Sequence, residues 1–169
     1  MTVINPRLPS GYTIFCDDIR QEYNGKLTFV GAYADTLIIN GPLPALLPKF
    51  CAMIVYREEP TSLEPVEIKI FLPGHDYDSP ATVFRIDAPQ PDLVPEQTGE
   101  FLMRECRFFW EGTGVVIEQE GQVRVRAFRG DEEIKLGAMI VTISPAFRGA
   151  NDETPDSVSE PSPSRSAGQ

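Results

Sequence analysis

The sequence is poor in the residues from which most catalytic and metal sites are built. It has one histidine, His75, and three cysteines in 169 residues. A single histidine excludes a zinc site that relies on several histidines. Cys16, Cys51 and Cys106 are odd in number and far apart, which is typical of buried thiols in a cytosolic protein and not of a disulfide framework. The candidate nucleophile that is left is the thiolate of Cys16 or Cys106 paired with His75. Catalytic thiols usually lie in exposed, electropositive pockets, which argues against this pair.

Long apolar runs and a basic leader are also missing. No segment approaches the roughly 20 apolar residues that a membrane helix needs. The opening MTVINPRLPS lacks the basic and then apolar pattern of a secretory signal. We therefore expect a cytoplasmic protein with no membrane association.

Basic charge is scarce as well. Lys and Arg number 15 against 25 Asp and Glu, which gives a net charge of −10. Because phosphate contacts need clustered Lys and Arg, we expect no nucleic-acid partner. The sequence also lacks the glycine-rich phosphate loops, C-x-x-C and H-E-x-x-H motifs. Accordingly, we assign no catalytic residue, no cofactor and no metal ligand.

A strong hairpin signal lies within residues 12–33. Asn24-Gly25 stands between two β-prone runs and favours a two-residue type I′ turn, in which both residues have positive φ. Pairing outward from this turn places Asp18 opposite Gly31.

Two adjacent aspartates interrupt the first arm of this hairpin. The predicted register puts Asp17 on the core face with Phe15, where a lone carboxylate is costly. We expect either a hydrogen-bonded Asp17 or a β-bulge at Asp17-Asp18 that turns it outward. Asp18 and Arg20 share the other face and are expected to form a structural ion pair. The alternative is a carboxylate site, for metal or acid–base chemistry, that also uses Glu22.

The rest of the chain alternates β-prone segments with turn signals. Residues 50–57 are apolar at nearly every position, which is typical of a strand covered on both faces. Further strands are expected at 37–39, 65–72, 81–87, 101–110, 115–118, 122–129 and 134–143, a helical turn near 43–47 and a surface loop at 88–99.

This spacing predicts one all-β domain over residues 1–148. The expected fold is an antiparallel β-sandwich of roughly eight strands, immunoglobulin-like or C2-like. Residues 149–169 are rich in Ser, Pro and acid, and we expect them to form a disordered tail.

The loop around His75 carries an acidic spacing that can bind Ca²⁺. Asp76 and Asp78 supply it, but the sequence that follows does not fit an EF-hand. A turn stabilised by Asp side chains is the simpler interpretation. A calcium site would need further acids, such as Asp35 or Asp87.

Arg124 and Arg126 alternate with apolar residues and should share one outward face. Glu118, Glu120 and Lys135 are the expected neighbours. The pattern indicates a solvated face of cross-strand pairs, with a patch for an anion or an acidic partner as the alternative.

Phe108, Phe109 and Trp110 place aromatic side chains on both faces of one strand. One face must meet the core, and the other can meet a loop or a partner chain. Self-association through this strand is therefore one interpretation.

The hairpin resembles the opening of a family of uncharacterised bacterial proteins, some of them in phage or prophage settings. The resemblance implies a shared domain and supplies no activity, cofactor or catalytic residue. The matching residues are Phe15, Cys16, Asp17, Asp18, Ile19, Arg20, Glu22, Gly25, Lys26, Gly31, Tyr33 and Leu47-Pro48-Lys49-Phe50.

These observations favour a non-enzymatic binding or interaction module, phage- or prophage-related by resemblance. Its expected partner is another protein or a second copy of the chain. The alternatives are a sandwich that binds a divalent metal and a carboxylate-dependent hydrolase.

Overall fold

A computed structural model describes residues 8–60, 62, 64–87 and 103–147. The tail expected at 149–169 and the loop expected at 88–99 lie outside these residues. The strands are β1 (Ser10–Cys16), β2 (Asp18–Gln21), β3 (Leu27–Val30), β4 (Thr36–Ile39), β5 (Ala45–Glu58), β6 (Val66–Phe71), β7 (Thr82–Ile86), β8 (Arg104–Ile117), β9 (Gly121–Arg129) and β10 (Glu132–Ile143).

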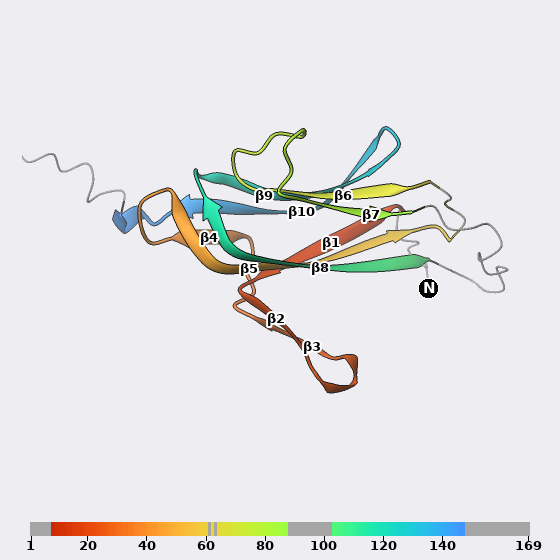
Figure 1. The fold of residues 1–169 in the computed structure, drawn as a ribbon, viewed down its shortest axis with the longest axis horizontal. Helices are drawn as coiled ribbons and strands as arrows, with labels where there is room; N and C mark the ends of the chain where they lie inside the picture. The colour runs from red at the N-terminus through yellow and green to blue at the C-terminus, as the bar shows by residue number, and fades with distance from the viewer. Residues whose placement is uncertain (1–7, 61, 63, 88–102, 148–169) are drawn as a thin grey trace, which may run out of the picture.

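The strands form two facing sheets and a separate hairpin. One sheet has the order β1-β5-β8 and the other the order β4-β10-β9-β6-β7. Strands β2 and β3 pair only with each other in the described part of the chain, and they project from the outer side of the three-stranded sheet (Figure 1). The predicted all-β sandwich is confirmed, with ten strands in the described residues and one parallel pair, β4 with β10.

The main core fills the space between the two sheets. On β6, Val66, Ile68 and Ile70 are fully buried while Glu67 and Lys69 face outward, as the predicted alternation requires. The facing side chains of β5 are Phe50, Ala52, Ile54 and Tyr56, all fully buried.

Strand β5 is longer than the sequence predicts. The helical turn expected near 43–47 is wrong, because Ala45–Glu58 is one strand and Leu47 lies opposite Val115 of β8. Cross-strand pairing with β8 overrides the weak local preference of these residues.

Strand β8 joins two segments that were predicted as separate strands. The side chains change face at Gly114, where φ is 64°. Before Gly114 the even-numbered residues, such as Trp110, face the core. After it the odd-numbered residues, such as Ile117, face the core. The glycine lets the side chains change face while the register with β5 stays the same on both sides of it.

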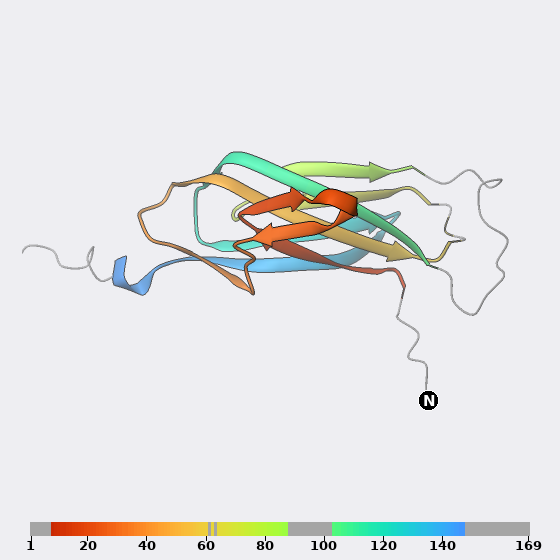
Figure 2. The same ribbon diagram turned by 90° about the horizontal axis from the view of Figure 1, so that it is seen from below.

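The segment predicted as one long hairpin pairs partly with β5 and partly with itself. Its first part, β1, pairs with β5 instead of with the second arm. Only β2 and β3 form the hairpin, and seen from below they lie across the outer face of the three-stranded sheet (Figure 2).

The predicted register of the hairpin is wrong by one residue. Asp18 lies opposite Val30 and not opposite Gly31. Ile19 consequently faces Phe29, and these two side chains share the face turned toward the sheet. A shift of one residue moves every side chain of the second arm to the other face.

The turn itself explains the shift. Asn24 and Gly25 have the expected positive φ, 64° and 73°. The loop nevertheless spans the three residues Tyr23–Gly25, and the N–H of Glu22 donates to the Lys26 carbonyl at 2.7 Å. One residue more than a two-residue type I′ turn displaces the pairing by one.

Candidate binding site around the β2–β3 hairpin

Asp17 is the hinge between the sandwich and the hairpin. It lies in a bend between β1 and β2, and its N–H donates to the Val30 carbonyl at 3.0 Å. Its carboxylate accepts a hydrogen bond from the Tyr33 hydroxyl. The Tyr33 N–H donates in turn to the Phe15 carbonyl at 2.9 Å. Asp17 does not take the core-facing position that the simple register gives it, because the chain bends there and the side chain is exposed. The expectation that its carboxylate is hydrogen-bonded is confirmed.

Gly31 makes room for this carboxylate. Its φ is 63°, and a Cβ at this position would overlap the Asp17 carboxylate. Both facts require glycine. The predicted register places Gly31 opposite Asp18, whereas in the structure Gly31 lies against Asp17.

Asp18 anchors the hairpin to the sandwich through charge. It accepts from Arg20 Nε at 3.0 Å, which is the expected pair, and from Lys49 Nζ at 2.5 Å. Lys49 also reaches Glu111 of β8 at 3.2 Å. The hydrogen bonds from Lys49 and then from Arg20 lower the pKa of Asp18. The hydrogen bonds that Lys49 donates to Asp18 and then to Glu111 raise the pKa of Lys49.

An apolar seam lies beneath the hairpin. Ile19 of β2 is buried, and Leu27 and Phe29 of β3 pack beside it. They cover side chains on the outer face of β1 and β5, where an antiparallel sheet commonly faces solvent. The covered residues are Ile14, Cys16, Cys51, Met53 and Val55.

A pocket of about 330 Å³ opens between the tip of the hairpin and β8. On the sheet side its wall includes Phe109, whose side chain is 37% exposed. Tyr23, at the tip of the same hairpin, is 88% exposed. The pocket is lined by Gln21, Glu22, Gly25, Lys26, Leu27, Arg107 and Phe109.

The three aromatic residues of β8 point alternately toward the core and toward the outer face. Phe108 packs on Phe84 with ring centroids 5.2 Å apart, and Trp110 meets Phe50 edge-on at 5.7 Å. Phe109 alone points to the outer face, which makes it the exposed aromatic of this strand.

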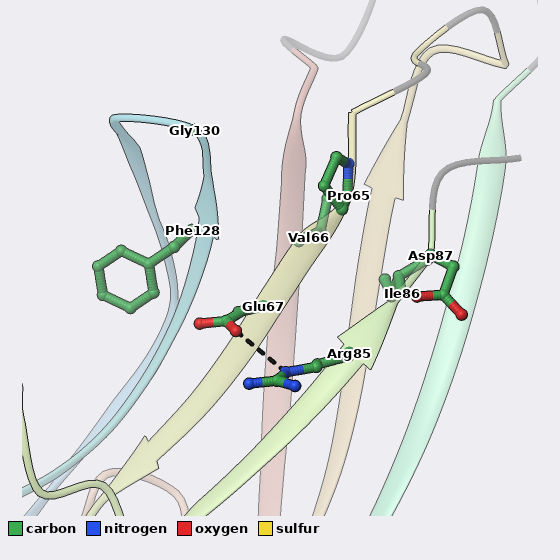
Figure 3. A pocket seen from close by; sticks show the side chains of 8 residues that line it. All are labelled: Pro65, Val66, Glu67, Arg85, Ile86, Asp87, Phe128 and Gly130. Carbon is green, nitrogen blue, oxygen red and sulfur yellow. Dashed lines mark hydrogen bonds and ion pairs between the residues drawn. The ribbon is translucent and has the colours of Figure 1, made fainter.

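A second pocket, of about 300 Å³, lies at the ends of β6 and β7 (Figure 3). Glu67 and Arg85 form an ion pair of 3.1 Å in it, beside Phe128. Glu67 also contacts Lys69 at 3.2 Å, and hydrogen bonding from Lys69, with Arg85 adding to it, lowers the pKa of Glu67. Because these charges already have partners, the pocket is the weaker candidate for a charged ligand.

The loop after β6 is a structured turn. The N–H of Asp78 donates to the Asp76 carboxylate at 3.1 Å, which is the predicted stabilisation by an Asp side chain. The His75 carbonyl accepts from Arg124 Nη2 at 2.6 Å. Tyr77 packs on the sheet, with its ring 5.4 Å from the ring of Phe71.

The prediction of a solvated Arg124 and Arg126 face is wrong. The Arg124 guanidinium lies over the rings of Phe71 and Tyr77. Arg126 is 9% exposed, with Nη1 donating to the Gly137 carbonyl at 3.0 Å. The loop that folds over this face was not visible in the alternation of β9.

A buried ion pair that could not be predicted from the sequence lies at the end of β5. Glu58 is fully buried and accepts from Arg104 Nε at 2.7 Å and from the Tyr56 hydroxyl at 3.1 Å. Burial, with the Glu58 charge adding to it, raises the pKa of Tyr56. No local pattern marks Glu58 as buried, because its partner Arg104 lies 46 residues away in the sequence.

The three thiols are free, and two of them are fully buried. Cys16 lies directly opposite Cys51 across β1 and β5. Cys106 is half-buried and lies opposite Tyr56 on β8. The sequence spacing carried no sign of this pairing, because it arises from two strands that meet only in the fold.

The side chains considered as metal ligands form no metal-binding cluster among the described residues. In the described part of the chain, no three His, Cys, Asp or Glu side chains are close enough to hold a metal ion. This applies to Asp76 and Asp78 with Asp35 or Asp87, and also to the acids of the hairpin. Within the same residues, no helix has the length and apolar character needed to cross a membrane.

Comparison with known proteins adds no relative. The chain matches no protein family, no curated protein and no solved structure.

Proposed function

We propose that the protein is a non-enzymatic interaction module that binds an extended segment of a partner protein between the β2–β3 hairpin and β8. The observation that carries the proposal is the position of the 330 Å³ pocket, which lies between a projecting hairpin and an edge strand. Such a place offers both side-chain contacts and backbone hydrogen bonds.

Strand β8 can supply the backbone contacts. It has 14 residues, and in the described part of the chain its only neighbour is β5. Its other edge therefore presents N–H and C=O groups that an added strand can pair with. A segment paired there would place alternate side chains on the outer face, next to Phe109 and the pocket.

The side chains around the pocket suit a partner with an apolar anchor and polar flanks. Phe109 and Tyr23 are exposed aromatic residues, a type enriched in protein interfaces. Glu22 and Lys26 of the hairpin bring both signs of charge to the lining. A mixed rim favours a polar partner segment over a strongly charged one.

We also propose a cellular location and a biological context for the module. The free thiols fit a reducing compartment, so we place the module in the cytoplasm. A bacterial, phage-related context rests on the resemblance of the hairpin.

Selection from a random peptide library displayed on yeast tests the proposal. A selected peptide is titrated into isotope-labelled protein, and backbone shifts are followed by NMR. We expect the shifts to concentrate in β8 and the hairpin. Phe109→Ser should weaken binding at least about tenfold, the scale of an interface anchor. Ile140→Ser is the matched control, since Ile140 is 48% exposed on β10 of the other sheet.

Binding that maps to another surface, or is equally weakened by both variants, would contradict the proposal. A concentration-dependent dimer that Phe109→Ser abolishes would replace the partner segment by a second copy of the chain.

A further inference from the structure

Cys16 and Cys51 are placed where a disulfide can form. They are directly opposite residues of the antiparallel pair β1 and β5. Opposite residues in such a pair have Cα atoms about 4.5 or 5.5 Å apart, depending on the hydrogen-bonding position. Both spacings fall within the Cα range of disulfides, about 4.4–6.8 Å. The side chains lie on the same face of the sheet and in the same apolar cluster.

The hairpin covers this pair. Both thiols have no exposed surface, and the side chains packed over their cluster include Leu27 and Phe29 of β3. Cys16 directly precedes the hinge residue Asp17. The Cys51 thiol donates to the Asp17 carbonyl at 3.5 Å. Displacement of the hairpin from β1 and β5 would uncover the two sulfur atoms.

Both thiols are weakly acidic in their covered positions. Burial, with the neighbouring Cys51 and Asp17 adding to it, raises the pKa of Cys16 to about 11. Burial also raises the pKa of Cys51. Because the thiolate is the reactive form, both sulfurs are inert while they are covered.

We propose that Cys16 and Cys51 are a disulfide-forming pair, oxidised by a small-molecule disulfide such as oxidised glutathione when the hairpin lifts from β1 and β5. The inference does not depend on the proposed partner binding. Cys106 does not take part, since it lies opposite Tyr56 on β8.

The reaction balances as two thiol–disulfide exchanges. One cysteine loses its proton and attacks a sulfur of oxidised glutathione, which forms a mixed disulfide and releases one glutathione thiolate. The second cysteine loses its proton and attacks the protein sulfur of the mixed disulfide, which releases the second glutathione. The two protons go to the two glutathione thiolates. The two cysteines are oxidised, and one glutathione disulfide is reduced to two thiols.

The test treats the intact chain with oxidised glutathione under native conditions and follows it by mass spectrometry. We expect loss of two hydrogen atoms, and a peptide map in which Cys16 is joined to Cys51. The oxidised protein should melt about 10 °C higher than the reduced one, because the bond closes a long loop of the unfolded chain. Cys51→Ser should prevent the cross-link, and Cys106→Ser should leave it unchanged.

A separate pair of variants tests whether the hairpin limits access to the two thiols. Phe29→Ala should speed oxidation about tenfold or more, because it removes a side chain packed over the thiols. Thr28→Ala, at the exposed neighbouring position of β3, should not change the rate.

A cross-link through Cys106, or glutathione adducts that never resolve to the internal bond, would overturn the pair. Oxidation that proceeds equally fast in the parent, Phe29→Ala and Thr28→Ala would overturn control by the hairpin. The peptide map of the parent decides the first point even if a variant does not fold.

Discussion

The Tyr33 hydroxyl donates a hydrogen bond to the Asp17 carboxylate at the root of the β2–β3 hairpin. The Asp17 N–H holds the other strand of the hairpin through the Val30 carbonyl. One residue thus fixes the point at which the chain leaves the sandwich, and its partner is an aromatic residue beyond the second arm and not the neighbouring Arg20.

Tyr33→Phe should destabilise the protein by about 1 kcal/mol, the usual net value of one hydrogen bond. Combined with Asp17→Ala, the two effects should be non-additive by about 0.5 kcal/mol or more, because both changes remove the same contact. Urea unfolding of the single and double variants measures this coupling. Arg20→Ala is the control, since Arg20 pairs with Asp18. Full additivity of the Tyr33 and Asp17 changes would show that the bond is not formed.

The same tyrosine predicts a pH dependence at the alkaline end. Burial, with the Asp17 hydrogen bond adding to it, raises the pKa of Tyr33. An unfolded tyrosine ionises near pH 10. The neutral hydroxyl therefore stabilises the fold below about pH 10, and this contribution is lost as the pH rises above that value. Tyr33→Phe should flatten the fall in unfolding free energy between about pH 9 and 11, whereas an unchanged slope would contradict the shift.

Gly31→Ala should be more harmful than Gly25→Ala. Both glycines have positive φ, 63° and 73°, so each change strains the backbone by about 1 kcal/mol or more. Only at Gly31 would the new Cβ also overlap the Asp17 carboxylate, whereas nothing lies within 4 Å of that position at Gly25. Melting temperatures of the two variants isolate the cost of the overlap. Equal losses would mean that Asp17 moves away freely.

The ion pairs of Asp18 that anchor the hairpin should weaken in acid. The Lys49 hydrogen bond, followed by that of Arg20, lowers the pKa of Asp18. Its contribution to stability is therefore complete above the unfolded value of about 3.9 and is lost as the pH falls below it. Lys49→Met should reduce this acid-dependent loss, as measured by unfolding between about pH 2 and 5. Lys135→Met, at an exposed position of β10, should leave the pH profile unchanged.

Arg104→Met should be among the most destabilising single changes in the chain. It would leave the fully buried Glu58 carboxylate without its cation, a loss that typically costs about 3–5 kcal/mol. Arg107→Met is the matched control from the same strand. Arg107 pairs with Glu105 at the surface, and an exposed pair contributes about 0–1 kcal/mol. Similar losses in chemical unfolding would show that Glu58 gains no special support from Arg104.

Features that depend on near neighbours in the chain could be predicted without the fold. The all-β class follows from short apolar alternation between turn residues, and the inward face of β6 could be read directly from Val66, Ile68 and Ile70. The positive φ of Asn24 and Gly25 was likewise predictable, because few other residues adopt it easily. The Asp18–Arg20 pair lies two residues apart and needs no tertiary information.

Contacts between distant segments of the chain could not be predicted and emerge only in the folded protein. Local pattern cannot show that β1 pairs with β5, since every β-prone segment can accept any other as its neighbour. The opposition of Cys16 and Cys51, the contact of Tyr33 with Asp17 and the burial of Glu58 beside Arg104 all follow from such pairings. The physical reason is that side-chain alternation specifies which face of a strand is apolar, whereas the packing of the whole chain selects the strand beside it and what covers the face.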